Sequence, residues 1–182
     1  MILASGSPQR RAILEQLGVE FRVEVPDVEE LFQGDPRRVV RENALRKVRA
    51  IAAPGDRVLG SDTAVVLDGR ILGKPRDEGE AETFLRRLSG RTHEVMSGIA
   101  LREPDGRERS DVAVTRVRFR RLEKPDLDWY LALGEWEGRA GAYAIQGRGA
   151  ALVEEIEGDY TGVVGLPVAA LLRLAPDLLE GR

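Results

Sequence analysis

The segment of residues 57–67 constrains the fold most, because it places an aspartate inside a strongly apolar stretch. Its apolar residues are dense enough for a buried strand, and they are Val58, Leu59, Val65, Val66 and Leu67. We expect Gly60-Ser61-Asp62 to interrupt that strand. A carboxylate in this position is unfavourable unless it is paired, hydrogen-bonded or bound to a metal. Asp62 is therefore a candidate metal ligand or general base, and the local sequence leaves a turn-capping aspartate open as the alternative.

The rest of the chain alternates between apolar segments of strand and helix type. Strands are predicted at residues 2–4, 21–25, 70–72, 93–101, 111–119 and 151–156. Helices are predicted from Pro8 until Gly18 ends the first, and at residues 36–52, 80–88, 125–133 and 167–174. The order lacks a strict parallel rhythm, so we expect an α/β fold with a mixed sheet flanked by helices. With 182 residues and no long linker, residues 1–182 are expected to form a single domain.

Composition excludes several classes of function. The chain has no cysteine, which removes disulfides, thiolate metal sites and thiol catalysis. His93 is the single histidine, so no multi-histidine zinc site exists, and a structural hydrogen bond is its favoured role. A net charge of -3 argues against a nucleic-acid partner. The sequence shows no signal peptide and no apolar run of ~20 residues, so we expect a cytoplasmic protein without a membrane partner.

The first candidate site follows the first predicted strand. There a small-residue turn containing Ser5 and Ser7 leads into a helix N-terminus, where free backbone N–H groups and the helix dipole favour phosphate. The two hydroxyls can donate hydrogen bonds, and Arg10 can hold phosphate oxygens in a bidentate manner. The alternative is that Ser7-Pro8 only caps a helix and that the arginine is solvated.

Two further segments carry polar residues among glycines. Only three of the 28 basic residues are lysines, so Lys74 beside Gly73 and Pro75 is a candidate point charge for phosphate, as is Lys47 on a helix face. Surface lysines are the alternative. In the Gly-rich segment 138–150, Gln146 can both donate and accept hydrogen bonds, which suits the edge of a nucleobase, although its glycines can equally serve packing. The chain has no Walker A pattern and no convincing dinucleotide fingerprint.

Taken together, five stretches resemble the Maf family of nucleoside triphosphate pyrophosphatases. They are LASGSPQRRAILEQLG, GSDTAVVLDGRILGKPRD, LSGRTHEVMSGIAL, GRAGAYAIQGRGA and GDYTGVVGLP, which occur in family order and span nearly the whole chain. The resemblance implies an elongated α/β protein with a mixed sheet and a central cleft between two lobes, similar to inosine-triphosphate pyrophosphatase. It also implies hydrolysis of a nucleoside triphosphate to the monophosphate and pyrophosphate, assisted by a divalent metal cation (Mg or Mn), and a homodimer.

The resemblance assigns roles residue by residue. Asp62 falls on the family's proton acceptor, and Glu30 falls on an acidic residue that would share metal binding with Asp62. Substrate-binding positions fall on residues that can neutralise or hydrogen-bond phosphate oxygens, namely Ser5, Ser7, Arg10, Lys47 and Lys74. Whether Asp62 acts as base or chiefly as metal ligand stays open, because both roles need the same carboxylate in nearly the same place.

Three positions are associated with base specificity in the family, and they fall on Gln9, Thr63 and Gln146. Thr63 and Gln146 match the branch that acts on dTTP and UTP. Gln9 departs from both branches, since the pyrimidine branch usually has arginine there and the 7-methyl-GTP branch usually has tryptophan. We therefore expect a dTTP/UTP pyrophosphatase, with roles in removing modified nucleotides and in cell-division arrest implied by the family. The alternatives are a 7-methyl-GTP pyrophosphatase and a non-catalytic, nucleotide-binding regulator of septum formation.

Overall fold

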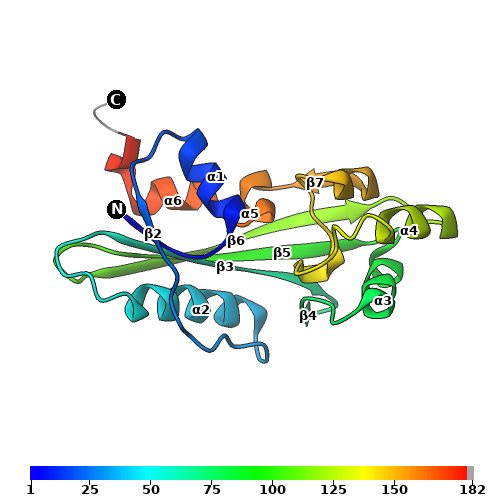
Figure 1. Cartoon of the computed structure of the whole chain (residues 1–182), viewed down its shortest axis with the longest axis horizontal. Coiled ribbons are helices and arrows are strands. Elements are labelled where there is room, and N and C mark those ends of the chain that lie inside the picture. Colours follow the sequence, from blue (N-terminus) through cyan, green and yellow to red (C-terminus); the bar gives the residue numbers. More distant parts are fainter. Residues whose placement is uncertain (180–182) are drawn as a thin grey trace.

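A computed structural model describes residues 1–179, which form one long twisted sheet with helices on both faces (Figure 1). The strands are β1 (Ile2–Ala4), β2 (Arg22–Glu24), β3 (Val58–Leu67), β4 (Arg70–Leu72), β5 (Thr92–Arg102), β6 (Glu108–Phe119) and β7 (Val153–Glu157). The helices are α1 (Pro8–Gln16), α2 (Pro36–Ala50), α3 (Glu78–Leu88), α4 (Lys124–Leu131), α5 (Tyr160–Val164) and α6 (Val168–Leu174), with short 3-10 turns η1 (Ala140–Ala142), η2 (Arg148–Leu152) and η3 (Pro176–Leu179). No helix in this range is long and apolar enough to cross a membrane.

The strand order β2-β1-β3-β5-β6-β7 confirms the predicted mixed sheet. β1 runs parallel to both β2 and β3, whereas the other neighbours are antiparallel, and β4 pairs with the end of β3. The long strands β3, β5 and β6 run through the whole length of the molecule (Figure 1). Along β6 the predicted alternation holds, since Val117 and Phe119 are buried while Arg116 and Arg118 are exposed.

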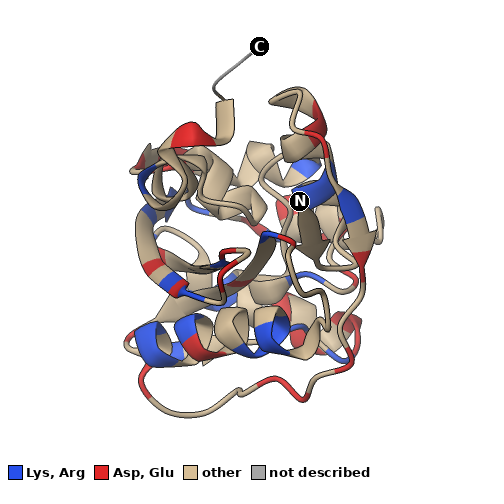
Figure 2. Cartoon of the chain, turned by 90° about the vertical axis from the view of Figure 1, so that its left-hand side faces the viewer, with Lys and Arg blue, Asp and Glu red and all other residues tan. Residues whose placement is uncertain are grey.

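Helix α2 covers one face of the sheet, and α1, α5 and α6 cover the other, which the end-on view of Figure 2 shows as two separate layers. Asp35 begins α2 by accepting a hydrogen bond from the backbone N–H of Arg38. Two glycines let α2 lie unusually close to the strands. A Cβ atom added to Gly60 would lie 2.6 Å from the carbonyl oxygen of Ala44, and one added to Gly98 would overlap the backbone carbonyl of Val40.

The two largest clusters of buried apolar side chains lie at opposite ends of the sheet. One cluster joins β1, α1 and α6 through residues such as Leu3, Leu14 and Leu171. The other joins β3, β6, α3 and α4 and includes Phe119 and Tyr130, both fully buried. Each end thus has a core of its own, as the expected two lobes require, while the long strands hold the ends together.

The predicted interruption of the third strand was wrong. β3 continues from Val58 to Leu67, and its pairing with β5 runs without a break from Val58 opposite Arg102 to Val66 opposite Glu94. Asp62 therefore lies inside a regular strand and does not cap a turn. The strand tolerates the carboxylate because side chains from α2 hydrogen-bond to it.

Smaller differences between the predicted and the observed elements occur at helix caps and in short helices. Helix α3 begins two residues before the predicted start, because Asp77 caps it by accepting from the N–H of Glu80. Helix α5 was not predicted, since its five residues are too few for a periodic pattern; Asp159 caps it. The segment predicted as a loop at 134–149 contains η1 and the start of η2.

Candidate active site

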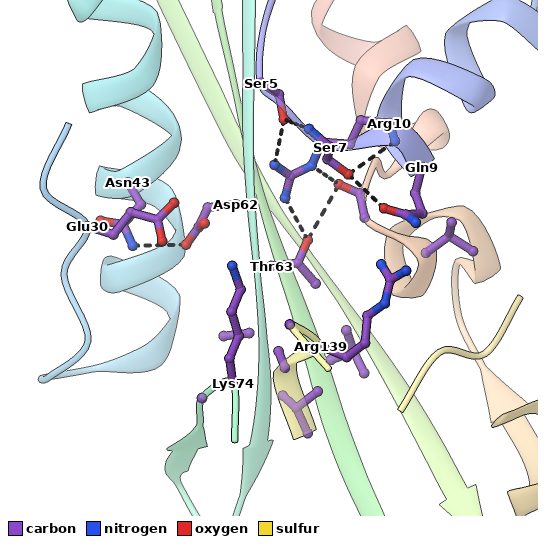
Figure 3. A pocket seen from close by; sticks show the side chains of 18 of the residues that line it. Ser5, Ser7, Gln9, Arg10, Glu30, Asn43, Asp62, Thr63, Lys74 and Arg139 are labelled. Carbon is purple, nitrogen blue, oxygen red and sulfur yellow. Dashed lines mark hydrogen bonds between the residues drawn. The ribbon is translucent and has the colours of Figure 1, made fainter. Parts of the chain in front are cut away.

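A cleft opens where one edge of β3 is free. On that edge β1 pairs with Val58 and Leu59, and β4 pairs with residues 65–67, so residues 60–64 have no strand beside them within the described chain. A cavity of about 790 Å³ lies along this free edge. All ten residues predicted for the site line it, namely Ser5, Ser7, Gln9, Arg10, Glu30, Lys47, Asp62, Thr63, Lys74 and Gln146. Most of them appear in Figure 3.

The alternation of β3 divides the site between the two faces of the sheet. Consecutive strand residues point to opposite faces, so Asp62 faces α2 while Thr63 faces α1 and α5 (Figure 3). Ser61 shares the face of Thr63, and its hydroxyl is hydrogen-bonded to the carbonyl of Gly165 at 3.0 Å. The free edge thus presents an acidic wall on one side and an arginine-lined wall on the other.

The acidic wall is organised by one buried lysine. Lys47 Nζ lies 2.8 Å from Asp62 Oδ1 and 2.6 Å from Glu30 Oε1, and it also donates to the carbonyl of Ser61 at 3.3 Å. The second oxygen of Asp62 accepts from Asn43 Nδ2 at 2.9 Å. Asn43 and Lys47 are four residues apart on α2 and hence share one face of the helix. Only 8% of the Lys47 side chain is exposed, so the surface-lysine alternative was wrong for this residue.

Glu30 is the more exposed carboxylate of the pair. Partial burial acts to raise its pKa, but the hydrogen bond and charge of Lys47, with the charges of Lys74 and Arg10, outweigh burial and lower the pKa below its ordinary value. Glu30 is therefore ionised at neutral pH.

The donor set at this wall suits a hard divalent cation. Among residues 1–179 no group of three or more acidic, histidine or cysteine side chains gathers as a ready-made metal cage. Mg²⁺, however, takes one or two carboxylates and completes its shell with water and substrate oxygens. Glu30 and Asp62 supply two carboxylates at one wall of the cleft, so the residues present fit such an ion.

Arg10 dominates the opposite wall. Its Nε donates to the carbonyl of Gly165 at 2.8 Å, one terminal nitrogen donates to Ser5 Oγ at 3.1 Å, and the other donates to Thr63 Oγ1 at 3.5 Å. Burial lowers the pKa of Arg10, while the charges of Asp62 and Glu30 act in the opposite direction. Three of the five N–H donors of an arginine are thus used within the protein, and two remain for a ligand.

The turn before α1 is both a cap and part of the cleft. Ser7 Oγ accepts from the N–H of Arg10 at 3.5 Å and donates to Gln9 Oε1 at 3.1 Å, which confirms the predicted cap. Ser5 Oγ accepts from the N–H of Ser7 at 3.2 Å as well as from Arg10. Because Ser5 only accepts in these contacts, its hydroxyl proton is available to a ligand, whereas that of Ser7 is engaged.

Thr63 is held by a chain of hydroxyl groups. Ser97 Oγ donates to the carbonyl of Gly162 at 2.7 Å and lies 3.0 Å from Thr63 Oγ1. The one proton of Ser97 goes to Gly162, so Thr63 donates to Ser97, with the carbonyl of Gly165 a more distant acceptor at 3.5 Å, and the Thr63 oxygen accepts from Arg10. Thr63, a predicted specificity residue, thereby supplies the longest of the three contacts that hold the guanidinium of Arg10.

Four cationic side chains line the cleft against two carboxylates. Arg10 and Lys47 are engaged as described, whereas Lys74 and Arg139 have no side-chain hydrogen bond or ion pair with any residue from 1 to 179. Lys74 follows β4 and is exposed, and Gln146 is exposed on the rim. Sequence reasoning gave no role to Asn43 or Arg139. The spacing of four residues from Lys47 was the available signal for Asn43.

Outside the cleft lining, the remaining motifs serve packing. His93 Nε2 is 2.8 Å from the hydroxyl of Tyr143 and both rings are buried, which confirms the structural role expected of the histidine. Gly141 lies against Val65 and Gly149 against Ala144, so these two glycines permit close backbone packing.

Comparison with known sequences gives consistent matches over nearly the whole chain. A family model described as Maf-like protein matches residues 1–178. The dTTP/UTP pyrophosphatase of Symbiobacterium thermophilum is 49% identical, over 92% of this chain and 88% of that protein. The dTTP/UTP pyrophosphatase of Thermus thermophilus is 46% identical, over 96% of this chain and 92% of that protein. Among solved structures, a HAM1 protein from Coxiella burnetii aligns with a TM-score of 0.49 and 22% identity, over 68% of this chain and 74% of that chain.

Proposed function

The chain belongs to the Maf-like protein family, and on that premise we propose that it hydrolyses dTTP and UTP to the monophosphate and pyrophosphate. The observation that carries this proposal is the position of Asp62. Its carboxylate lies at the free edge of β3, is oriented by Lys47 and Asn43, and faces a cleft with two unengaged cations. Curated relatives with 49% and 46% identity are named dTTP/UTP pyrophosphatase.

The reaction needs a water molecule directed at the α-phosphorus. In the proposed step the water oxygen forms a bond to the α-phosphorus, the bond from that phosphorus to the bridging oxygen breaks, and pyrophosphate leaves with the bonding electrons. Asp62 accepts the water proton, since each carboxylate oxygen has one partner in the protein and further accepting capacity. Lys74 and the two remaining donors of Arg10 neutralise the phosphate chain and the leaving group.

A divalent cation would bind at Glu30 and Asp62. When bound, it would neutralise triphosphate oxygens and make the α-phosphorus more electrophilic. Lys47 contacts both carboxylates, so that they keep their orientation when the anionic phosphate chain enters.

We assign selection of a pyrimidine base to Gln146 at the rim of the cleft. Uracil and thymine present an N–H donor between two carbonyl acceptors, and the amide of Gln146 can match such an edge because it both donates and accepts. Thr63 acts in a different way, since its hydroxyl is engaged with Ser97 and Arg10. We therefore assign Thr63 to fixing Arg10 rather than to contact with the base.

The test is pyrophosphate release from dTTP, UTP, CTP, 7-methyl-GTP and GTP, with Mg²⁺ or Mn²⁺, by the wild type and Asp62→Asn. A general base contributes about 10²–10⁴-fold, so we expect turnover of dTTP and UTP that falls by at least about 10²-fold in the variant. Asp128→Asn is the matched control, because Asp128 is an exposed carboxylate outside the cleft lining. Turnover chiefly of 7-methyl-GTP would overturn the pyrimidine assignment. Nucleotide binding without turnover would instead support a regulator of septum formation.

A further inference from the structure

Arg139 is the cationic residue of the cleft for which neither the sequence nor the proposed reaction has yet given a role. It precedes η1, and its side chain extends into the cleft towards Gln9, on the side of β3 away from Glu30 (Figure 3). Its Nε is buried and has no hydrogen-bond partner in the described chain. A buried donor without a hydrogen-bond partner is unfavourable. A bound ligand that accepts a hydrogen bond from this N–H group would remove that cost.

The segment that carries Arg139 is fixed to the hairpin that carries Lys74. The backbone N–H of Gly141 donates to the carbonyl of Gly73 at 3.0 Å. Gly141 also has a left-handed backbone (φ 67°), and a Cβ atom there would lie 2.8 Å from Val65 Cγ1. Only glycine fits this position, so the segment packs directly on β3. The hydrogen bond from Gly141 to Gly73 then fixes the position of the segment beside Lys74.

The charges of the cleft show what kind of group is missing. Lys47 is neutralised by Glu30 and Asp62, and Arg10 gives three donors to protein oxygens. Arg139 and Lys74 therefore supply the positive charge in the described cleft that forms no ion pair, and the charges of Glu135 and Glu30 act on them only at longer range. A guanidinium binds phosphate oxygens through paired N–H groups, which an ammonium cannot reproduce.

We propose that Arg139 is a substrate-binding residue that holds the phosphate chain of the nucleoside triphosphate together with Lys74, from the side of the cleft opposite the acidic wall. The inference rests on the proposed function for the identity of the ligand. It extends that function by placing a second contact to the phosphates on the segment after residue 138, so that the chain is held from both sides while Asp62 acts on the water.

The experiment separates the phosphate chain from the nucleoside by a series of ligands. Binding of dUTP with an imido bridge between the α- and β-phosphates, of dUMP and of deoxyuridine is measured by calorimetry with the full chain. Arg139→Gln removes the charge and Arg139→Lys keeps it. Arg148→Gln is the matched control, because Arg148 is an exposed arginine outside the cleft lining. Thermal unfolding without ligand shows whether each variant is folded.

We expect Arg139→Gln to weaken binding of the triphosphate analogue about 10–100-fold, since a charged hydrogen bond is lost. Binding of dUMP should weaken less, and that of deoxyuridine should not change. The KM for UTP should rise in parallel with a smaller change in kcat, and Arg139→Lys should restore part of the affinity. Equal losses for the triphosphate and for deoxyuridine would place Arg139 at the base and overturn the proposal, as would unchanged triphosphate binding.

The wild-type arm keeps the two proposals apart. A wild type that releases pyrophosphate while Arg139→Gln binds normally overturns the role of Arg139 alone. A wild type that binds the analogue without turnover overturns the proposed function, and the same ligand series then still decides whether Arg139 binds phosphate. A wild type that neither binds nor cleaves overturns both.

Discussion

Replacing Lys47 by methionine should destabilise the protein by an amount that depends on pH. The ammonium of Lys47 lies between Asp62 and Glu30, at 2.8 and 2.6 Å from their oxygens. Methionine keeps an unbranched apolar side chain in the helix but removes the charge. Two ionised carboxylates then face each other across the space that the ammonium occupied.

The magnitude follows from how much water reaches the three groups. Removing one partner of a buried ion pair costs about 3–5 kcal/mol. The side chains of Lys47 and Asp62 are 8% and 13% exposed, but Glu30 is 32% exposed, so water screens part of the repulsion. We therefore expect a loss at the lower end, about 3 kcal/mol at pH 8. For a chain of this size that loss corresponds to a fall in Tm of roughly 6–12 °C.

The pH dependence has a definite sign. In the wild type the pKa of Glu30 is lowered, so its ion pair contributes stability above about pH 4.5 that is lost as the pH falls through the folded-state pKa. In Lys47→Met the hydrogen bond and charge that lower the pKa of Glu30 are gone, so Glu30 binds a proton more readily and the repulsion is relieved in acid. The difference in unfolding free energy between wild type and variant should therefore shrink between pH 8 and pH 4.5.

Urea unfolding of both proteins at the two pH values measures this difference. Arg46→Met, at the neighbouring position of α2 with an exposed side chain, should cost less than about 1 kcal/mol at either pH. The double variant Lys47→Met/Glu30→Gln should recover part of the loss, because one of the two negative charges is gone. A loss below 1 kcal/mol for Lys47→Met, or the same loss at both pH values, would refute the reasoning.

Two further predictions concern buried positions of the central strands. Burial lowers the pKa of His93 to about 4, so this neutral histidine contributes up to about 3 kcal/mol above pH 6.5 that is lost as the pH falls towards 4. His93→Gln should remove that part of the pH dependence in urea unfolding between pH 7 and 4.5, and an unchanged slope would contradict it. Gly98→Ala should cost about 3 kcal/mol, the upper end of the usual range for overpacking, because the new Cβ would overlap the backbone of Val40. A Tm within 2 °C of the wild type would contradict this, because it would show that α2 can move away from the new Cβ with little loss of stability.

The sequence pattern predicted most helices and strands correctly, because helix caps and the alternation of buried and exposed residues depend on residues that are close in the sequence. Ser7 and Pro8 begin α1 as predicted, and the alternation along β6 identifies its buried face. The error at Gly60-Ser61-Asp62 has a tertiary cause. A carboxylate in an apolar strand reads as a break unless one knows that Lys47 and Asn43, on a helix earlier in the chain, hydrogen-bond to it.

For the site, too, the residues that belong to sequence motifs were predicted, whereas a residue defined by its three-dimensional surroundings was not. Residues in motifs were found from the sequence, and the ten predicted positions line one cleft. Arg139 was missed because no sequence pattern shows which cations are paired. In the structure Lys47 and Arg10 have partners, whereas the buried Nε of Arg139 has none within the described residues. The roles of the ten residues, the divalent cation, the single domain and the homodimer stay predictions.

β3 forms the floor of the cleft, and its uninterrupted pairing with β5 limits how the molecule can move. A hinge between the two ends of the sheet would break ladder hydrogen bonds directly beneath Asp62 and Thr63. Entry of substrate and release of pyrophosphate are therefore left to the walls, where residues 25–35 form no strand or helix and η1 is a single short turn. In hydrogen exchange the β3 amides that bond to β5 would be among the slowest, and those of the walls among the fastest. Asp62 and Thr63 would then keep one geometry through the whole catalytic cycle, and any opening of the cleft would come from its walls.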